Sequence, residues 1–317
     1  MTIHSKAVST AVVFAYHDIG VRCLDVLLEL GFEIKLVVTH QDSKSEKIWF
    51  DSVQDLAQKH GLPVITPDDA NTDQVIEQVA KCAPEFIFSF YYRQMLGQAL
   101  LDIPVRGAFN LHGSLLPKYR GRVPVNWAII NGEKETGVSL HRMEIRPDAG
   151  NLLAQAAISI LRNDTAHAVF QKLTCAAENL LIEVLPEMLE GRIIEMPLDL
   201  EQGSYFSGRK PEDGLIDWHL PAEDIHNLIR AVAPPYPGAF FHHESHTVEV
   251  LGSYFRAERA CFKETCIYVE KGQFQADCSD GQRFMITQMV IDGEVLEPAY
   301  FESIFGPRLV PGQGGGL

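Results

Sequence analysis

Asn110 and His112 place an amide and an imidazole two residues apart, in the run FNLHGSLLPKYRG of residues 109–121. In an extended strand, residues i and i+2 point to the same face, so both side chains could reach one atom. Asp148 follows later in the chain, on a turn with the sequence RPDAG. An amide that donates to an oxyanion, an imidazole that moves a proton and a carboxylate that orients it suffice for acyl transfer to an amine. We therefore take these three as the candidate catalytic residues.

The elements that must position these residues alternate between strand and helix patterns. Short apolar runs predict strands at 11–15, 32–39, 62–65, 85–90 and 105–111, and longer segments predict helices at 21–30, 46–60 and 72–82. Such alternation indicates an α/β fold, with a Rossmann-like parallel sheet that has helices on both faces. Open sheets of this kind bind ligands at the carboxyl ends of their strands, where the run 105–111 delivers Asn110 and His112.

The turn that carries Asp148 lies between two further predicted strands, 136–143 and 152–160, which have no helix between them. An antiparallel pair around the turn is therefore expected. The longest helical pattern follows at 163–189, where Asp164 or Thr165 could cap the start and Gly191 ends the helix.

The composition changes near residues 201–208. Beyond them, a predicted helix at 222–233 precedes short alternating segments up to Phe305, which indicate a small β-barrel or sandwich. We predict a catalytic domain at 1–203, a small β-rich domain at 204–305 and a flexible tail at 306–317.

Composition narrows the functional classes. The net charge is −15, and residues 201–317 carry 17 acidic against 9 basic residues, which argues against a nucleic-acid partner. No apolar run is long enough for a membrane span, and no signal peptide precedes the first strand, so a cytoplasmic protein is expected. The six cysteines form no CxxC pair, which argues against a zinc site or a disulfide framework. His242, His243 and His246 could bind a metal, but no nearby Cys or Asp completes a ligand set, and we expect no metal.

The segments FNLHGSLLPKYRGR and RPDAG resemble the folate-dependent formyltransferase family. Within it, FAYHDIG, FSFYYR, NGEKETGVSLHRM and RAVAPPYPGAF are similar to the formyltransferase domains of bifunctional polymyxin-resistance enzymes, which formylate UDP-4-amino-4-deoxy-L-arabinose for lipid A. The resemblance runs from about residue 10 to about residue 300. It implies N10-formyltetrahydrofolate as co-substrate, no metal, a nucleotide-linked amino sugar as acceptor, and an OB-like barrel as the second domain.

The resemblance also implies roles for single residues. Asn110 would stabilise the oxyanion, His112 would transfer the proton, and Asp148 would hold His112 in one tautomer and favour its protonated form. The positions that match the folate site are Gln94, Met95, Leu96, Arg122, Glu144, Ile145, Arg146, Pro147 and Asp148. The candidate contacts of the acceptor substrate are Ser114, Tyr119 and Arg120, although Ser114 could instead bond within its own loop. We interpret His141, in the strand before Asp148, as structural.

Two alternatives share these features. A methionyl-tRNA formyltransferase has the same motif, but the acidic C-terminal portion argues against tRNA. A non-catalytic folate-binding protein would not require Asn110, His112 and Asp148 together. In the bifunctional enzymes an NAD-binding decarboxylase domain follows, and here none does, so the chain either acts alone or is part of a longer protein. It could form a homo-oligomer. The family motif does not identify the sugar or the nucleotide.

Overall fold

The computed structural model describes residues 8–42 and 48–311. The contacts between these residues divide the chain into two compact units. The first comprises 1–122, 136–158 and 171–206, and the second comprises 123–135, 159–170 and 207–317. Each unit has its own sheet, and we describe the two separately.

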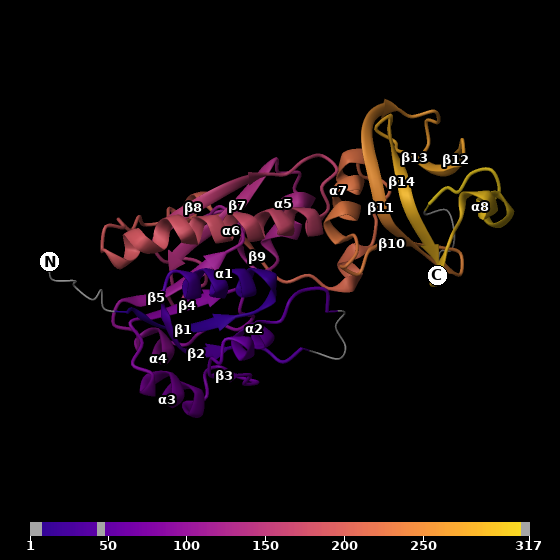
Figure 1. Cartoon of the computed structure of the whole chain (residues 1–317). Coiled ribbons are helices and arrows are strands. Elements are labelled where there is room, and N and C mark those ends of the chain that lie inside the picture. Colours follow the sequence, from indigo (N-terminus) through magenta and orange to yellow (C-terminus); the bar gives the residue numbers. More distant parts are fainter. Residues whose placement is uncertain (1–7, 43–47, 312–317) are drawn as a thin grey trace. The chain divides into compact units, whose positions relative to one another are not determined.

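A seven-stranded sheet forms the centre of the first unit (Figure 1). Its strands, in spatial order, are β3 (Val64–Ile65), β2 (Glu33–Val38), β1 (Thr10–Ala15), β4 (Phe86–Phe90), β5 (Gly107–His112), β7 (Glu135–Arg142) and β8 (Leu152–Ser159). The first five are parallel, and β7 pairs with β5 in the antiparallel direction. The predicted Rossmann-like parallel sheet is confirmed, with the Asp148 segment added as an antiparallel edge.

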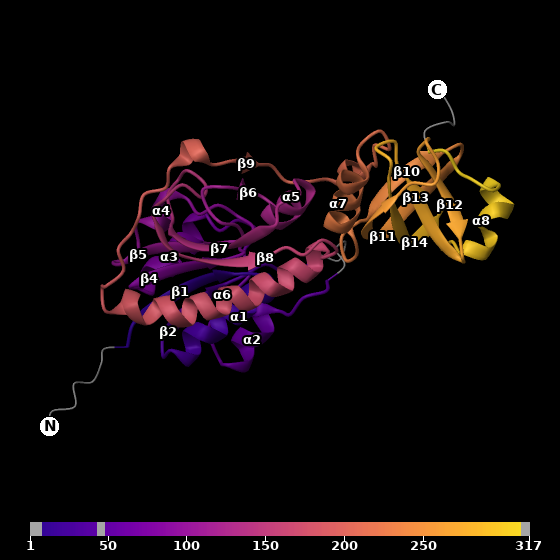
Figure 2. The same cartoon turned by 90° about the horizontal axis from the view of Figure 1, so that it is seen from above.

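Helices cover both faces of this sheet, as Figure 2 shows. One face carries α1 (His17–Glu29), α2 (Val53–Lys59) and α6 (Ala166–Leu189), and the other carries α3 (Asp73–Lys81) and α4 (Gln98–Leu101). An ion pair between Arg22 and Glu178 joins α1 to α6, with 2.6 Å between the charged atoms. On the opposite face, Val12 and Phe14 of β1 pack with Val75 of α3 in one apolar cluster. Alternation along the buried strands thus supplies apolar side chains to both helical layers.

Two helices begin later than their apolar patterns predict, because a hydroxyl group caps each start. The Oγ of Ser52 accepts the amide of Asp55 at 3.2 Å, so α2 starts at Val53. Residues 46 and 47 of its predicted range lie outside the described residues. The Oγ1 of Thr165 accepts the amide of Ala168 at 3.2 Å and caps α6.

The loop after β5 carries two short elements. In β6 (Arg120–Gly121) the chain pairs in parallel with β9 (Tyr205–Phe206). Tyr119 and Val123 flank β6 with left-handed backbones, at φ of 56° and 47°. The helix α5 (Pro124–Ile130) then begins with a proline in its first turn, where the missing N–H costs nothing.

The second unit is built on an antiparallel sheet packed on α7 (Ala222–Val232). Its pairing path runs through β10 (Ala239–His243), β11 (His246–Arg259), β14 (Gln282–Ile291), β13 (Gln273–Asp277) and β12 (Cys266–Glu270), with β15 (Glu294–Val295) attached to β14. The short 3₁₀ turn η2 (Pro211–Gly214) belongs to this unit, whereas η1 (Leu200–Gln202) belongs to the first. Ile225 and Ile229 of α7 share one core with the strands. The predicted β-rich C-terminal domain is confirmed.

The end of the second unit differs from the prediction in two respects. Residues 298–305, expected to continue the strand pattern, form α8 (Pro298–Phe305), which begins at a proline and packs through Phe301 into the core. In the predicted flexible tail, Leu309 is buried and exchanges two backbone hydrogen bonds of 2.8 Å with Ile267. Within residues 8–42 and 48–311, no helix is both long and apolar enough to cross a membrane.

Candidate active site

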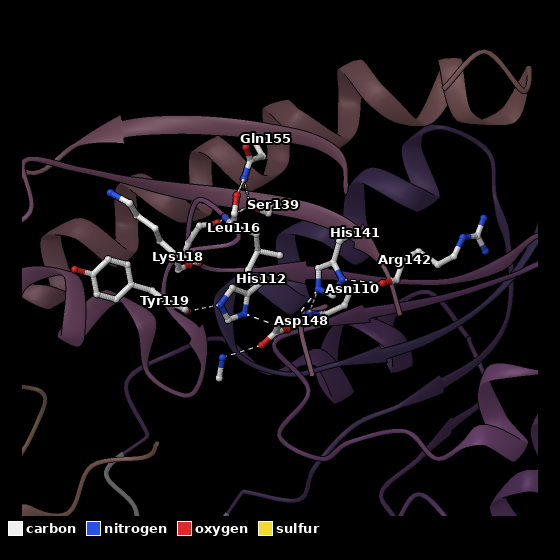
Figure 3. Close-up of polar contacts among 12 residues, drawn as sticks. Asn110, His112, Leu116, Lys118, Tyr119, Ser139, His141, Arg142, Asp148 and Gln155 are labelled. Atoms are coloured by element: carbon white, nitrogen blue, oxygen red, sulfur yellow. Dashed lines mark hydrogen bonds and ion pairs between the residues drawn. The ribbon is translucent and has the colours of Figure 1, made fainter. Parts of the chain in front are cut away.

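The structure brings Asn110, His112 and Asp148 together at the end of β5 (Figure 3). His112 Nδ1 lies 3.5 Å from Asp148 Oδ1. Asn110 reaches the same cluster through His141, whose Nε2 lies 3.1 Å from Asn110 Nδ2 and 3.4 Å from Asp148 Oδ1. The predicted spacing of i and i+2 along a strand therefore delivers both side chains to the same place.

Asp148 is the electrostatic centre of this cluster. Its backbone is left-handed, at φ of 49°, and its Oδ2 accepts the amide of Gly121 at 2.9 Å. Burial opposes ionisation of the carboxyl group, but His112 and the hydrogen bond from the Gly121 amide favour the charged form, and the pKa of Asp148 lies well below its usual range. A permanent negative charge thus lies beside two imidazoles.

The hydrogen bonds of His112 determine which nitrogen carries a proton. Its Nε2 lies 2.8 Å from the carbonyl oxygen of Tyr119, and a carbonyl oxygen only accepts, so Nε2 donates there. The other nitrogen, Nδ1, faces Asp148 and can take up a second proton against the carboxylate. The ring is only 7% exposed. His112 therefore has one ring nitrogen against a carbonyl oxygen and the other against a fixed anion.

His141 is the residue of this site that the sequence analysis assigned to a structural role. It lies on β7 directly opposite Asn110 of β5, and it is only 2% exposed. Burial agrees with a structural role, but the ring contacts two of the three candidate catalytic residues. Its place in the sequence TGVSLHRM gives no sign of this, because the cross-strand register alone brings it there.

The loop that follows His112 is held by side chains of the first unit. The Oγ of Ser114 donates to the carbonyl of Lys118 at 2.7 Å, and Ser139 Oγ donates to the carbonyl of Ser114 at 2.6 Å. Gln155 ties the same loop through the carbonyl of Leu116 at 2.9 Å. Ser114 is fully buried, so the geometry favours its role within the loop over contact with a substrate.

The other two predicted substrate contacts, Tyr119 and Arg120, are also largely buried. The ring of Tyr119 stacks on Phe206 at 5.2 Å between centroids. The backbone N–H of Tyr119 donates a hydrogen bond to Ser204 Oγ at 2.8 Å, which holds the backbone in place. Arg120 is 7% exposed, and within the described residues its Nε has no hydrogen-bond partner. Tyr119 thus contributes its backbone carbonyl to the site, while Arg120 keeps donor capacity.

The predicted folate positions lie in three segments of the first unit. Gln94, Met95 and Leu96 follow β4; the Gln94 amide bonds the backbone of Ala70 and Asp68, and Leu96 is buried in the core, so only its backbone could meet a ligand. The second segment follows β7, and its members Glu144, Ile145 and Arg146 are exposed. Arg122, directly after β6, is exposed as well.

A metal site is not evident in the described part of the chain, where no three His, Cys, Asp or Glu side chains are grouped to hold an ion. His242, His243 and His246 lie on a β-hairpin of the second unit. His246 Nδ1 pairs with Asp292 at 2.5 Å, and His242 Nδ1 contacts Thr247 Oγ1 at 3.3 Å. These contacts are local to the hairpin and its neighbouring turn.

Comparisons with known proteins give a consistent result. Residues 22–185 match the family described as formyl transferase, and residues 209–300 match the formyl transferase C-terminal domain. The fold is similar to WlaRD, a sugar 3N-formyl transferase solved with dTDP and 5-N-formyl-THF, at a TM-score of 0.68 and 22% identity over 87% of this chain and 96% of that one.

Two further solved structures have the same fold. One is the N-formyltransferase from Helicobacter canadensis in complex with folinic acid and dTDP-3-aminofucose, at a TM-score of 0.68 and 21% identity, over 88% of this chain and 98% of that one. The other is HypX from Aquifex aeolicus in complex with tetrahydrofolic acid, at a TM-score of 0.62 and 17% identity, over 92% of this chain and 46% of that one.

Proposed function

Because the chain belongs to the formyl transferase family, we propose that it transfers the formyl group of N10-formyltetrahydrofolate to the primary amine of a nucleotide-linked amino sugar. The observation that carries the proposal is the cluster of Asn110, His112 and Asp148 at the end of β5. The folate donor is supported by the 5-N-formyl-THF solved with WlaRD and the folinic acid solved with the Helicobacter canadensis enzyme. The amino-sugar acceptor is supported by the sugar 3N-formyl transferase activity named for WlaRD and by the dTDP-3-aminofucose in the Helicobacter canadensis complex.

In the proposed reaction the amine nitrogen attacks the formyl carbon, and the bond from that carbon to N10 breaks once the proton has moved. Asn110 Nδ2 donates to the oxygen of the tetrahedral intermediate, where loss of one donor costs roughly 10²–10³ in rate. His112 accepts the proton of the amine and returns it to N10 as the folate leaves. Nε2 of His112 already donates its proton to the Tyr119 carbonyl, so Nδ1, beside Asp148, is the ring nitrogen that takes up the proton of the amine.

Asp148 supports this proton transfer through its charge. Its carboxylate faces His112 Nδ1 and stabilises the imidazolium that forms when Nδ1 takes the amine proton. We place the folate beside Arg122 and the segments 94–96 and 144–148, and the acceptor beside the loop 114–122. UDP-4-amino-4-deoxy-L-arabinose and dTDP-linked 3-amino sugars are the acceptors we consider first.

A panel of UDP- and dTDP-amino sugars, incubated with N10-formyltetrahydrofolate and followed by mass spectrometry, tests the proposal. We expect one or a few of them to be formylated, and the Asn110→Ala and His112→Ala variants to lose roughly 10²–10⁴ of kcat. Initiator methionyl-tRNA serves as the competing acceptor in the same assay. Efficient formylation of the tRNA with every amino sugar inert would replace the proposed acceptor.

A further inference from the structure

We propose that His141 is a positioning residue that fixes the orientation of the Asn110 amide, so that an N–H rather than the carbonyl oxygen faces the reacting formyl group. This inference rests on the proposed function, because it assigns Asn110 to the oxyanion. His141 is the direct partner of Asn110 on the neighbouring strand β7, and its ring contacts the Asn110 amide (Figure 3).

The first step of the argument is the tautomer of His141. Its Nδ1 lies 2.8 Å from the carbonyl oxygen of Arg142, which only accepts, so Nδ1 carries a proton. In the neutral ring Nε2 is then an acceptor. Nε2 lies 3.1 Å from Asn110 Nδ2, so this acceptor meets an amide N–H. The tautomer and the amide orientation follow from this network of hydrogen bonds.

The second step concerns what the amide offers to a substrate. The Nδ2 group carries two hydrogens, and one of them is donated to His141, so the amide cannot turn over without losing this bond. The second hydrogen remains for the oxygen that becomes negative during acyl transfer. An amide turned by 180° would present an acceptor there and would repel the oxyanion.

The third step separates this role from an alternative in which His141 acts on the carboxylate. Asp148 Oδ1 also faces His141 Nε2, at 3.4 Å, and a protonated ring would donate to it. A proton on Nε2 would, however, oppose the N–H of Asn110, which is the closer partner at 3.1 Å. His112, on the far side of the same carboxylate oxygen, can supply the proton instead. The geometry therefore assigns neutral His141 to Asn110.

A double-mutant cycle tests this assignment. We expect His141→Leu to lower kcat roughly 10–100-fold with little change in either KM, because misplacing an oxyanion donor affects the transition state. His141→Gln, whose side-chain oxygen can accept the Asn110 N–H, should recover most of the loss. In the Asn110→Ala background, His141→Leu should change kcat less than threefold, since the residue that it positions is gone.

Each outcome of the cycle decides the proposal. If His141→Leu lowers kcat equally in the wild-type and Asn110→Ala backgrounds, the proposal is overturned. It is also overturned if the fall in kcat is absent in the Asp148→Asn background but persists in the Asn110→Ala background. His226→Gln is the matched control: His226 is a fully buried histidine of the second unit, and its replacement should leave kcat and the Asn110 cycle unchanged.

A measurement independent of turnover separates this inference from the proposed function. Nitrogen-15 NMR of the imidazoles, with the His141 signals identified by their absence in His141→Gln, should show a protonated Nδ1 and a bare Nε2. If no acceptor is formylated but this tautomer is found, the proposed function fails while the arrangement of His141 stands. A protonated Nε2 would contradict the inference whatever the activity.

Discussion

Replacing Asp148 with asparagine removes the charge of the site while keeping its shape. The asparagine oxygen can still accept the amide of Gly121, which now donates to Oδ2 at 2.9 Å. At 3.5 Å and an effective dielectric constant of about 20, a full carboxylate–imidazolium interaction with His112 amounts to roughly 5 kcal/mol. Because His112 carries only part of a positive charge in the transition state, we expect about 3–4 kcal/mol to be lost, which corresponds to a fall in kcat of roughly 10²–10³.

Single-turnover kinetics with a saturating formyl donor measures this loss without interference from product release. Asp277→Asn is the matched control, since Asp277 is a buried carboxylate of the second unit that accepts the amides of Cys261 and Phe262. We expect Asp277→Asn to lower stability with little effect on kcat. A kcat for Asp148→Asn within tenfold of the wild type would refute the electrostatic role of Asp148.

Two further predictions concern stability. In Gly150→Ala, the added Cβ would lie 2.1 Å from the carbonyl oxygen of Arg142, so we expect the turn that carries Asp148 to shift, with a melting temperature several degrees lower and a reduced kcat; an unchanged kcat would show that the turn adapts. Burial lowers the pKa of His226 to about 4, below the usual 6.5, so between these values the unfolded state binds a proton that the folded state does not. The free energy of unfolding should therefore be highest above about pH 6.5 and fall by up to roughly 3 kcal/mol towards pH 4. Denaturant unfolding of His226→Gln should show a flatter profile over this range.

The sequence predicts the architecture well where local patterns are strong. Buried strands such as β1 and β4 are apolar but for Thr10 and Ser89, and the helices between them carry clear stop signals at Gly31 and Gly61. The α/β alternation and the family assignment are both confirmed. The strand pattern failed at α8, where Pro298 begins a helix that packs Phe301 into the core. Packing of this kind depends on contacts that are distant in sequence.

The candidate site divides in the same way. Asn110 and His112 share a face because strand geometry requires it, and this could be predicted from their spacing. The role of His141 could not be predicted, because residues 136–141 of β7 are all buried and their pattern does not show which side chains lie on the same face as Asn110. Only the register with Asn110 settles the question. Ser114 is a second case, because its burial becomes visible only once the loop is closed.

The pairing of β6 with β9 has a consequence for how the site is assembled. The loop that carries Tyr119 and Gly121 is fastened by Ser204 and Phe206, and Tyr119 and Ser204 are 85 positions apart in the chain. During synthesis, Asn110 and His112 therefore leave the ribosome long before residues 204–206, which hold the loop beside them. Closing so long a loop carries an entropic cost that local strand and helix formation does not. The Tyr119 carbonyl that contacts His112 therefore depends on a segment that is synthesised much later.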